Sequence, residues 1–295
     1  MLSILIPTYN YCIFPLVEEL LIQVKKCTID YEIVTLADGS DTFLAENQKI
    51  NNLDNCSYEV LEHNIGRSAI RNLLVQKAKF ENLLFLDADV IPVGEDFISN
   101  YIAVIDREQK VVYGGIRYQQ QQPEREQMLR WVYGNSREAL SAEQRNKNPY
   151  LCFLTLHFLI KKSIFKIVTF NEEIHGYGHE DTLFSFDLKQ KGILIKHIEN
   201  PVYHLGLDNS RIFLRKSEEA VENLKFLIES GLVDSAYTKL GCIYIRLKKY
   251  RLRSLVQFCY KIAKPILLRN LFSKNPSLYI FDLFRLGYFC DIKKE

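Results

Sequence analysis

The chain has 295 residues, of which 47% are hydrophobic, 25% charged and 12% aromatic, which suits one large α/β domain or a domain with an appendage. Seven cysteines without a CxxC pair disfavour a disulfide framework or a four-thiolate zinc site, and favour a reducing compartment. No apolar run approaches the roughly 18 residues that a membrane-spanning helix needs, so secreted, fibrous and transmembrane classes are all disfavoured.

The net charge of +2 conceals two parts of opposite sign. Residues 239–295 hold 13 Lys and Arg against three Asp and Glu, whereas residues 1–238 hold 25 against 33. We therefore expect the two parts to face different partners.

The N-terminal part alternates strand and helix signals. Residues 2–6, 31–36 and 58–61 are predicted strands, residues 65–79 have helical spacing, and residues 83–86 form a fully apolar strand. The apolar start lacks a basic n-region, so it indicates a first strand rather than a signal peptide. This alternation predicts a mainly parallel sheet covered on both faces, with ligands at the carboxyl ends of its strands.

The polar segment 119–149 breaks this pattern. Its middle, residues 126–140, favours a helix. The segment is a mobile insertion near the site, a helical excursion or a polar linker. Residues 151–170 return to apolar β-type sequence, and residues 180–191 predict an amphipathic helix with Gly192 as its C-cap.

The sequence LLFLDADV, residues 83–90, is the strongest chemical signal. A buried strand that ends in two carboxylates one residue apart, Asp87 and Asp89, places hard oxygen ligands at one spot, as Mg²⁺ or Mn²⁺ with bound phosphates requires. The alternative is a solvated Asp-x-Asp turn.

A second acidic pair, Glu180-Asp181, follows a glycine-punctuated stretch. Carboxylates at a helix start are kept ionised by the helix dipole, so an aspartate there can serve as a base at neutral pH. The alternative is an ordinary acidic first turn. His204, in YHLG, is a third candidate, although a lone histidine is more often structural than a ligand.

Six segments follow one another in the order ILIPTYN, DGS, NIGRSAIRN, LDAD, GYGHED and YHLG. Together they resemble the motifs of a family 2-type GT-A glycosyltransferase. The GYGHED part is similar to the galactosyl/N-acetylgalactosaminyltransferase-type segment of chondroitin-synthase-like enzymes. The resemblance covers residues 1–206 and implies a GT-A fold (a Rossmann-like, mainly parallel sheet flanked by helices) in residues 1–215. Residues 216–295 form a mostly helical, basic C-terminal extension in this interpretation.

The resemblance also implies roles for particular residues. The nucleotide-sugar site would comprise Pro7, Thr8, Tyr9, Asp38, Arg67, Arg71 and Asp87. The family often has two acidic residues before Gly-Ser, and here the first is Ala37, which leaves Asp38 alone. The two arginines lie four apart, and their alternative role is a solvated basic face.

The metal, Mn²⁺ or Mg²⁺, would be held by Asp87, Asp89 and His204. Asp181 would be the catalytic base and Glu180 would orient hydroxyl groups. One displacement at the anomeric carbon would then invert its configuration, with the metal offsetting charge on the leaving diphosphate.

Acceptor recognition is weakly indicated. Trp131 stacks on a sugar or pins a helix to the body, and His175, Tyr177 and His179 flank the carboxylates. Resemblance favours UDP-Gal or UDP-GalNAc as donor, with UDP-GlcNAc or UDP-glucose as alternatives. The acceptor would be a saccharide or lipid-linked oligosaccharide in surface polysaccharide synthesis.

From residue 239 the basic tail interleaves cations with apolar residues at helical spacing until Pro265. It lies on an anionic membrane or packs on the catalytic domain, and a nucleic acid partner is disfavoured because no RNA-binding signature accompanies it. The expected location is cytoplasmic, with peripheral contact to the inner face of the membrane.

Three other functions fit the sequence less well. A haloacid-dehalogenase-type phosphohydrolase also ends a strand in D-x-D, but its other motifs are not found in order here. A nicotinamide-dependent dehydrogenase would need a GxGxxG motif after the first strand, and this sequence has none there. A non-catalytic sugar-nucleotide-binding module would need no catalytic base, so the presence of Asp181 in this chain disfavours it.

Overall fold

The computed structural model describes residues 1–174 and 176–292. Among these residues, seven strands form a central sheet in the order β3 (Cys56–Val60), β2 (Tyr31–Ala37), β1 (Leu2–Thr8), β4 (Asn82–Leu86), β8 (His157–Lys161), β6 (Lys110–Tyr113) and β9 (Leu194–His197). All neighbours pair in parallel except β8, which is antiparallel to both β4 and β6. The expected α/β fold with a mainly parallel sheet is confirmed.

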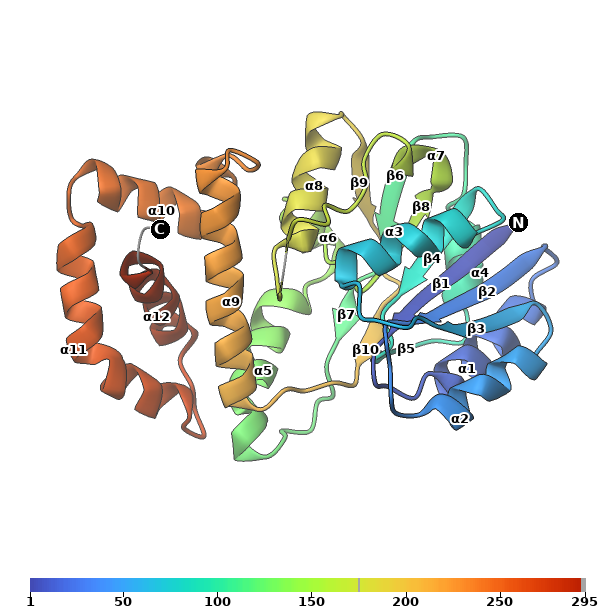
Figure 1. The fold of residues 1–295 in the computed structure, drawn as a ribbon, viewed down its shortest axis with the longest axis horizontal. Coiled ribbons are helices and arrows are strands. Elements are labelled where there is room, and N and C mark those ends of the chain that lie inside the picture. The colour runs from blue at the N-terminus through green and yellow to red at the C-terminus, as the bar shows by residue number, and fades with distance from the viewer. Residues whose placement is uncertain (175, 293–295) are drawn as a thin grey trace.

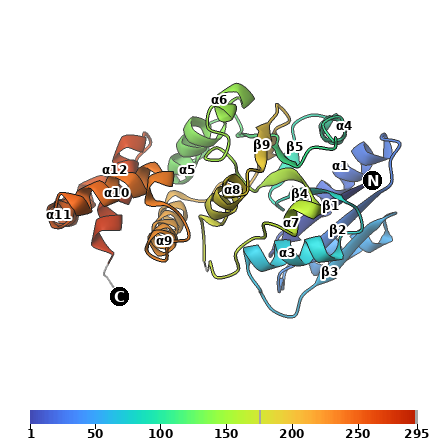
Figure 2. The ribbon, with the colours of Figure 1, turned by 90° about the horizontal axis from the view of Figure 1, so that it is seen from above.

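Helices cover both faces of this sheet, which explains why the inner strands β1, β2 and β4 are buried along almost their whole length. Figure 2 shows α1 (Phe14–Lys25) and α4 (Phe97–Ile102) on one face, and α3 (Arg67–Lys77) and α7 (Lys162–Phe165) on the other. The short α2 (Leu44–Gln48) follows β2. The main core is built from the buried strand residues and the inner faces of these helices.

A second, small sheet closes the end of the first. In the part of the chain that the structure describes, it has three strands in the order β5 (Val90–Pro92), β10 (Val202–His204) and β7 (Ile116–Arg117). β10 is antiparallel to β5, with His204 opposite Val90. This pairing carries the YHLG segment to the residues that follow β4.

The polar segment 119–149 is folded. It contains α5 (Met128–Tyr133), a π-helical turn (Gly134–Glu138) that continues it, and α6 (Ala142–Asn146), so the expected helix is confirmed. Residues 151–170 were expected to be β-type, but only β8 within them is a strand, because the chain turns into α7 directly after Lys161. The helix expected at 180–191 is α8 (Glu180–Gln190).

The C-terminal part is helical, as expected, with α9 (Ser210–Glu229), α10 (Lys239–Lys249), α11 (Arg253–Leu271) and α12 (Leu278–Asp291). Figure 1 shows α9 between the sheet and the other three helices. The expected division at residue 215 falls inside α9, and it stays a prediction. No helix in the described ranges is long and apolar enough to cross a bilayer.

Pro265 does not interrupt the basic helix, contrary to expectation, and lies inside α11. Proline removes one N–H from the helix and leaves a carbonyl one turn earlier unpaired. Because Pro265 is exposed, water can satisfy that carbonyl, and the packing of α11 against α12 maintains the helix.

Candidate active site

The predicted donor residues lie where strands end, as parallel-sheet topology requires. β1 ends in Pro7-Thr8, followed by Tyr9, and β2 is followed by Asp38. Thr8 and Asp38 are buried, whereas Tyr9 is 57% exposed. The backbone N–H of Asp38 donates to the Thr8 carbonyl at 2.8 Å, which joins the two strand ends.

The Asp38 carboxylate already holds a loop in place. Its two oxygens accept hydrogen bonds from the backbone N–H groups of Ile65 (2.7 Å) and Gly66 (3.1 Å), which directly precede α3. Asp38 therefore positions the start of α3, and with it the two arginines that follow.

Arg71 and Asp87 form a largely buried ion pair. Arg71 Nη2 lies 2.5 Å from Asp87 Oδ1, and the Arg71 side chain is only 4% exposed. Burial raises the pKa of Asp87, while Arg71 acts in the opposite direction. A buried carboxylate needs such a partner, so Arg71 is not part of a solvated basic face.

Asp89 and His204 meet across the small sheet. The Leu205 N–H donates to the Asp89 carbonyl at 2.8 Å, and His204 Nε2 lies 3.5 Å from Asp89 Oδ2. Gly206 makes this approach possible, because a Cβ there would lie 2.7 Å from Asp89 Oδ2. This steric constraint explains why the residue at position 206 in YHLG is glycine, which has no Cβ.

These two side chains suit a divalent cation. Burial lowers the pKa of His204, which favours the neutral imidazole that a metal needs, and Nε2 is the ring nitrogen that faces Asp89. Ligands at right angles on one Mg²⁺-sized ion lie about 3 Å apart, close to the Asp89–His204 separation. The donor set therefore fits a metal.

The three-ligand set expected from the sequence is not assembled. In residues 1–174 and 176–292 no group of three or more His, Cys, Asp and Glu is arranged to hold an ion, and Asp87 pairs with Arg71 instead. Asp89 and His204 are the side chains that would hold a divalent cation here, and a bound diphosphate would supply further oxygen ligands.

The acidic pair lies at the start of α8, as predicted. Arg67 Nη1, from the start of α3, lies 3.4 Å from Glu180 Oε1, so the acidic pair lies beside this donor residue although it follows Arg67 by more than a hundred positions. The expectation that the helix dipole keeps Asp181 fully ionised is wrong, because burial, and secondarily the Glu180 charge, raises its pKa to about 7. A carboxyl group titrating there is matched to proton transfer at neutral pH.

The loop before α8 is held from two sides. The Tyr177 ring has Arg67 at 4.8 Å and Lys216 of α9 at 5.1 Å from its centroid. Asn223 Nδ2, also of α9, donates to the carbonyls of Tyr177 (3.2 Å) and Gly178 (3.1 Å). The C-terminal helices thus help to position the loop that presents Asp181.

The weak acceptor candidates have structural roles. The Trp131 indole N–H donates to the Gln119 carbonyl at 2.8 Å, and the ring packs against the main core. His179 is in a left-handed conformation at the N-cap of α8, and burial lowers its pKa to about 4. His175 lies outside the described residues. A role of these residues in acceptor binding stays a prediction.

A buried network beside the site was not predicted. Arg130 of α5 pairs with Glu138 at 2.9 Å and donates to the Tyr118 hydroxyl at 2.7 Å, and the Tyr118 ring lies 5.7 Å from that of His204. Nothing in the sequence distinguishes Arg130 and Glu138 from the other polar residues of segment 119–149, or Tyr118 from other tyrosines, because their burial depends on distant elements.

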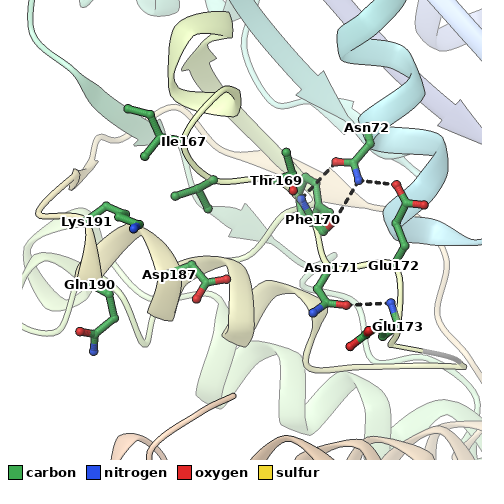
Figure 3. Close-up of a pocket in the computed structure, with 11 residues that line it drawn as sticks. Asn72, Ile167, Thr169, Phe170, Asn171, Glu172, Glu173, Asp187, Gln190 and Lys191 are labelled. Atoms are coloured by element: carbon green, nitrogen blue, oxygen red, sulfur yellow. Dashed lines mark hydrogen bonds between the residues drawn. The ribbon is translucent and has the colours of Figure 1, made fainter. Parts of the chain in front are cut away.

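A hollow of about 570 Å³ lies apart from the predicted donor, metal and acidic-pair residues (Figure 3). It is lined by Asn72 of α3, residues 167–173 and three residues of α8 and its C-cap. Asn72 Nδ2 donates to the Phe170 carbonyl (2.9 Å) and to Glu172 Oε1 (2.8 Å), so α3 also anchors the segment that leads to the acidic pair. None of the predicted donor or metal residues lines it.

Acidic and basic side chains thus gather at the carboxyl ends of the sheet's strands, next to the acidic pair at the start of α8. The family described as glycosyl transferase family 2 matches residues 3–169, more than half of the chain. The protein belongs to the family 2 glycosyltransferases.

More distant similarities agree with this. Chondroitin synthase of Escherichia coli is 24% identical over 237 residues, and the match covers 69% of this chain but 34% of that protein. The chain thus spans about a third of the length of this curated relative.

Two solved structures have a similar fold. One is the mannosyltransferase PcManGT of Pyrobaculum calidifontis in complex with GDP-Man and Mn²⁺ (TM-score 0.55, 16% identity, 77% of this chain and 64% of that chain). The other is residues 1–349 of S. aureus TarS in complex with UDP-GlcNAc (TM-score 0.52, 17% identity, 98% and 90%). At these identities the similarity shows the fold alone.

Proposed function

We propose that this enzyme transfers a sugar from a UDP-sugar to a saccharide hydroxyl with inversion, in a metal-dependent reaction. The observation that carries the proposal is the convergence of three sequence-distant groups. Arg67 at the start of α3 contacts Glu180, which is next to Asp181. Arg71, one turn later on α3, pairs with Asp87 after β4, and Asp89, two residues further on, lies beside His204. Family membership supports glycosyl transfer, and the phosphohydrolase alternative has no comparable support.

Each group has a separate task in this reaction. Pro7, Thr8, Tyr9 and Asp38 would line the base and ribose, and Arg67 and Arg71 the diphosphate. A bound Mn²⁺ or Mg²⁺ offsets negative charge on the leaving diphosphate. Asp181, with a pKa of about 7, accepts the proton of the acceptor hydroxyl, and Glu180 orients hydroxyl groups next to it.

The donor and acceptor are proposed from relatives. Similarity to a chondroitin synthase favours Gal or GalNAc, and GlcNAc and Glc are the alternatives to test. The acceptor is a saccharide or lipid-linked oligosaccharide in surface polysaccharide synthesis. We place the enzyme in the cytoplasm, at the inner face of the membrane, since a lipid-linked acceptor requires contact with that surface.

UDP release from a panel of UDP-sugars, with Mn²⁺ and with EDTA, tests the proposal. We expect metal-dependent release that is strongest for one sugar and is lost in Asp89→Ala. Asp54→Ala is the matched control, because the Asp54 side chain is 79% exposed and lies outside the site.

Calorimetry with UDP and Mn²⁺ separates the outcomes. Binding without release, with or without a panel of acceptors, would favour the binding-module alternative. If the protein neither binds UDP nor releases it from any UDP-sugar, the proposed donor class is wrong.

A further inference from the structure

The outer face of α11 carries an exposed apolar stripe. Leu255, Phe258, Ile262 and Ile266 follow each other at helical spacing, and their side chains are 57%, 63%, 63% and 73% exposed. The stripe extends over about 17 Å at the rise of an α-helix. Contiguous apolar surface of this kind indicates an interaction site rather than a solvated helix.

The opposite face of the same helix accounts for its packing within the protein. Tyr260 and Leu271 are buried with Phe281 and Phe284 of α12, so α11 is fixed to the body by its inner side. Figures 1 and 2 show α11 as the outermost helix, on the side of the molecule away from the sheet. The stripe therefore faces outward at one end of the molecule.

The charge around the stripe selects its partner. Residues 235–281 contain ten Lys and Arg and no Asp or Glu. Lys248, Lys249 and Arg251 are exposed before the stripe, and Arg269 and Lys274 are exposed after it. A flat apolar strip with cations at both ends complements an anionic lipid headgroup layer over an apolar interior.

We propose that α11 docks on an anionic lipid bilayer, with Leu255, Phe258, Ile262 and Ile266 inserted at the headgroup boundary and the flanking cations on the headgroups. A second copy of the chain is a poorer partner, because it would bring two sets of cations together. The stripe has a single aromatic ring, whereas single-stranded nucleic acid binding uses several for base stacking.

Flotation of the full chain with vesicles tests this proposal. We compare vesicles of phosphatidylcholine alone with vesicles that contain about 30% phosphatidylglycerol, enough for a strong negative surface potential. Wild type is expected to float with the anionic vesicles and to dissociate as salt is raised. Ile262→Ser/Ile266→Ser is expected to lower the bound fraction at least tenfold.

Ile22→Ser is the matched control, because Ile22 is 56% exposed and lies on α1, far from α11 (Figure 1). It is expected to float as wild type does. UDP release in solution checks that all variants stay folded and active, and keeps this test separate from that of the proposed reaction.

Three outcomes would overturn the proposal. In the first, wild type does not float with anionic vesicles. In the second, the double serine variant floats as well as wild type. In the third, wild type floats equally with neutral and anionic vesicles. A dimer in sedimentation that the double serine variant abolishes would assign the stripe to a second copy instead.

Discussion

Replacement of Asp181 by Asn should stabilise the protein while it abolishes transfer. Burial raises the pKa of Asp181 from 3.8 to about 7, whereas the unfolded chain keeps the ordinary value. Between these two pH values the folded state holds a proton that the unfolded state releases, so wild-type stability falls as pH rises and levels off above pH 7. At 1.36 kcal/mol per pKa unit, the full loss is about 4 kcal/mol.

The asparagine side chain of the variant carries no such cost, because an amide does not ionise. Asp181→Asn should therefore match wild type near pH 4 and exceed its free energy of unfolding by about 4 kcal/mol at pH 8. Urea denaturation at both pH values measures this, with Asp54→Asn as an exposed control. A variant no more stable than wild type at pH 8 would refute the reasoning.

The same titration governs catalysis. A base must be deprotonated to accept the acceptor proton, so kcat/KM of wild type should fall about tenfold per pH unit below pH 7. Asp181→Asn should lose at least about 100-fold in rate at any pH, as expected for removal of a general base. Near-normal turnover in this variant would exclude Asp181 from the role.

Three further predictions concern other parts of the site. Arg71→Met should lower the free energy of unfolding by about 2 kcal/mol, because it leaves the partly buried Asp87 carboxylate without its cationic partner. Adding Asp87→Asn should recover part of this loss, and a double-mutant cycle in urea that shows no coupling would contradict the prediction. Gly178→Ala should slow UDP release at least tenfold, because Gly178 has a φ of +95° and a Cβ there would lie 2.7 Å from the Cβ of Ala220. Gly192→Ala, strained but with nothing near its added Cβ, should release UDP at the wild-type rate, and equal loss in both would point to general destabilisation. His204→Gln should raise the Mn²⁺ concentration for half-maximal release at least tenfold, and an unchanged Mn²⁺ titration would remove His204 from the metal site.

Much of the fold could be predicted because its signals are local. The short apolar run before Asp87 favours a strand buried on both faces, and the spacing of residues 65–79 is that of a helix packed on one side. The antiparallel direction of β8 could not be predicted, since a strand's direction depends on which neighbour it pairs with and not on its own side chains. The prediction that Pro265 interrupts the helix was wrong for a related reason. Packing against α12 maintains a helix that proline alone would weaken.

The candidate site divides in the same way. The sequence by itself determined the chemistry that is present: acidic residues after an apolar strand, a second acidic pair at a helix start, and a histidine in the segment YHLG. Only the tertiary structure decided their partners. It paired Asp87 with Arg71 and Asp89 with His204, and it buried Asp181 so that its pKa rises to about 7. Desolvation and ion pairing depend on atoms brought together from distant parts of the chain, and residue type and spacing do not specify them.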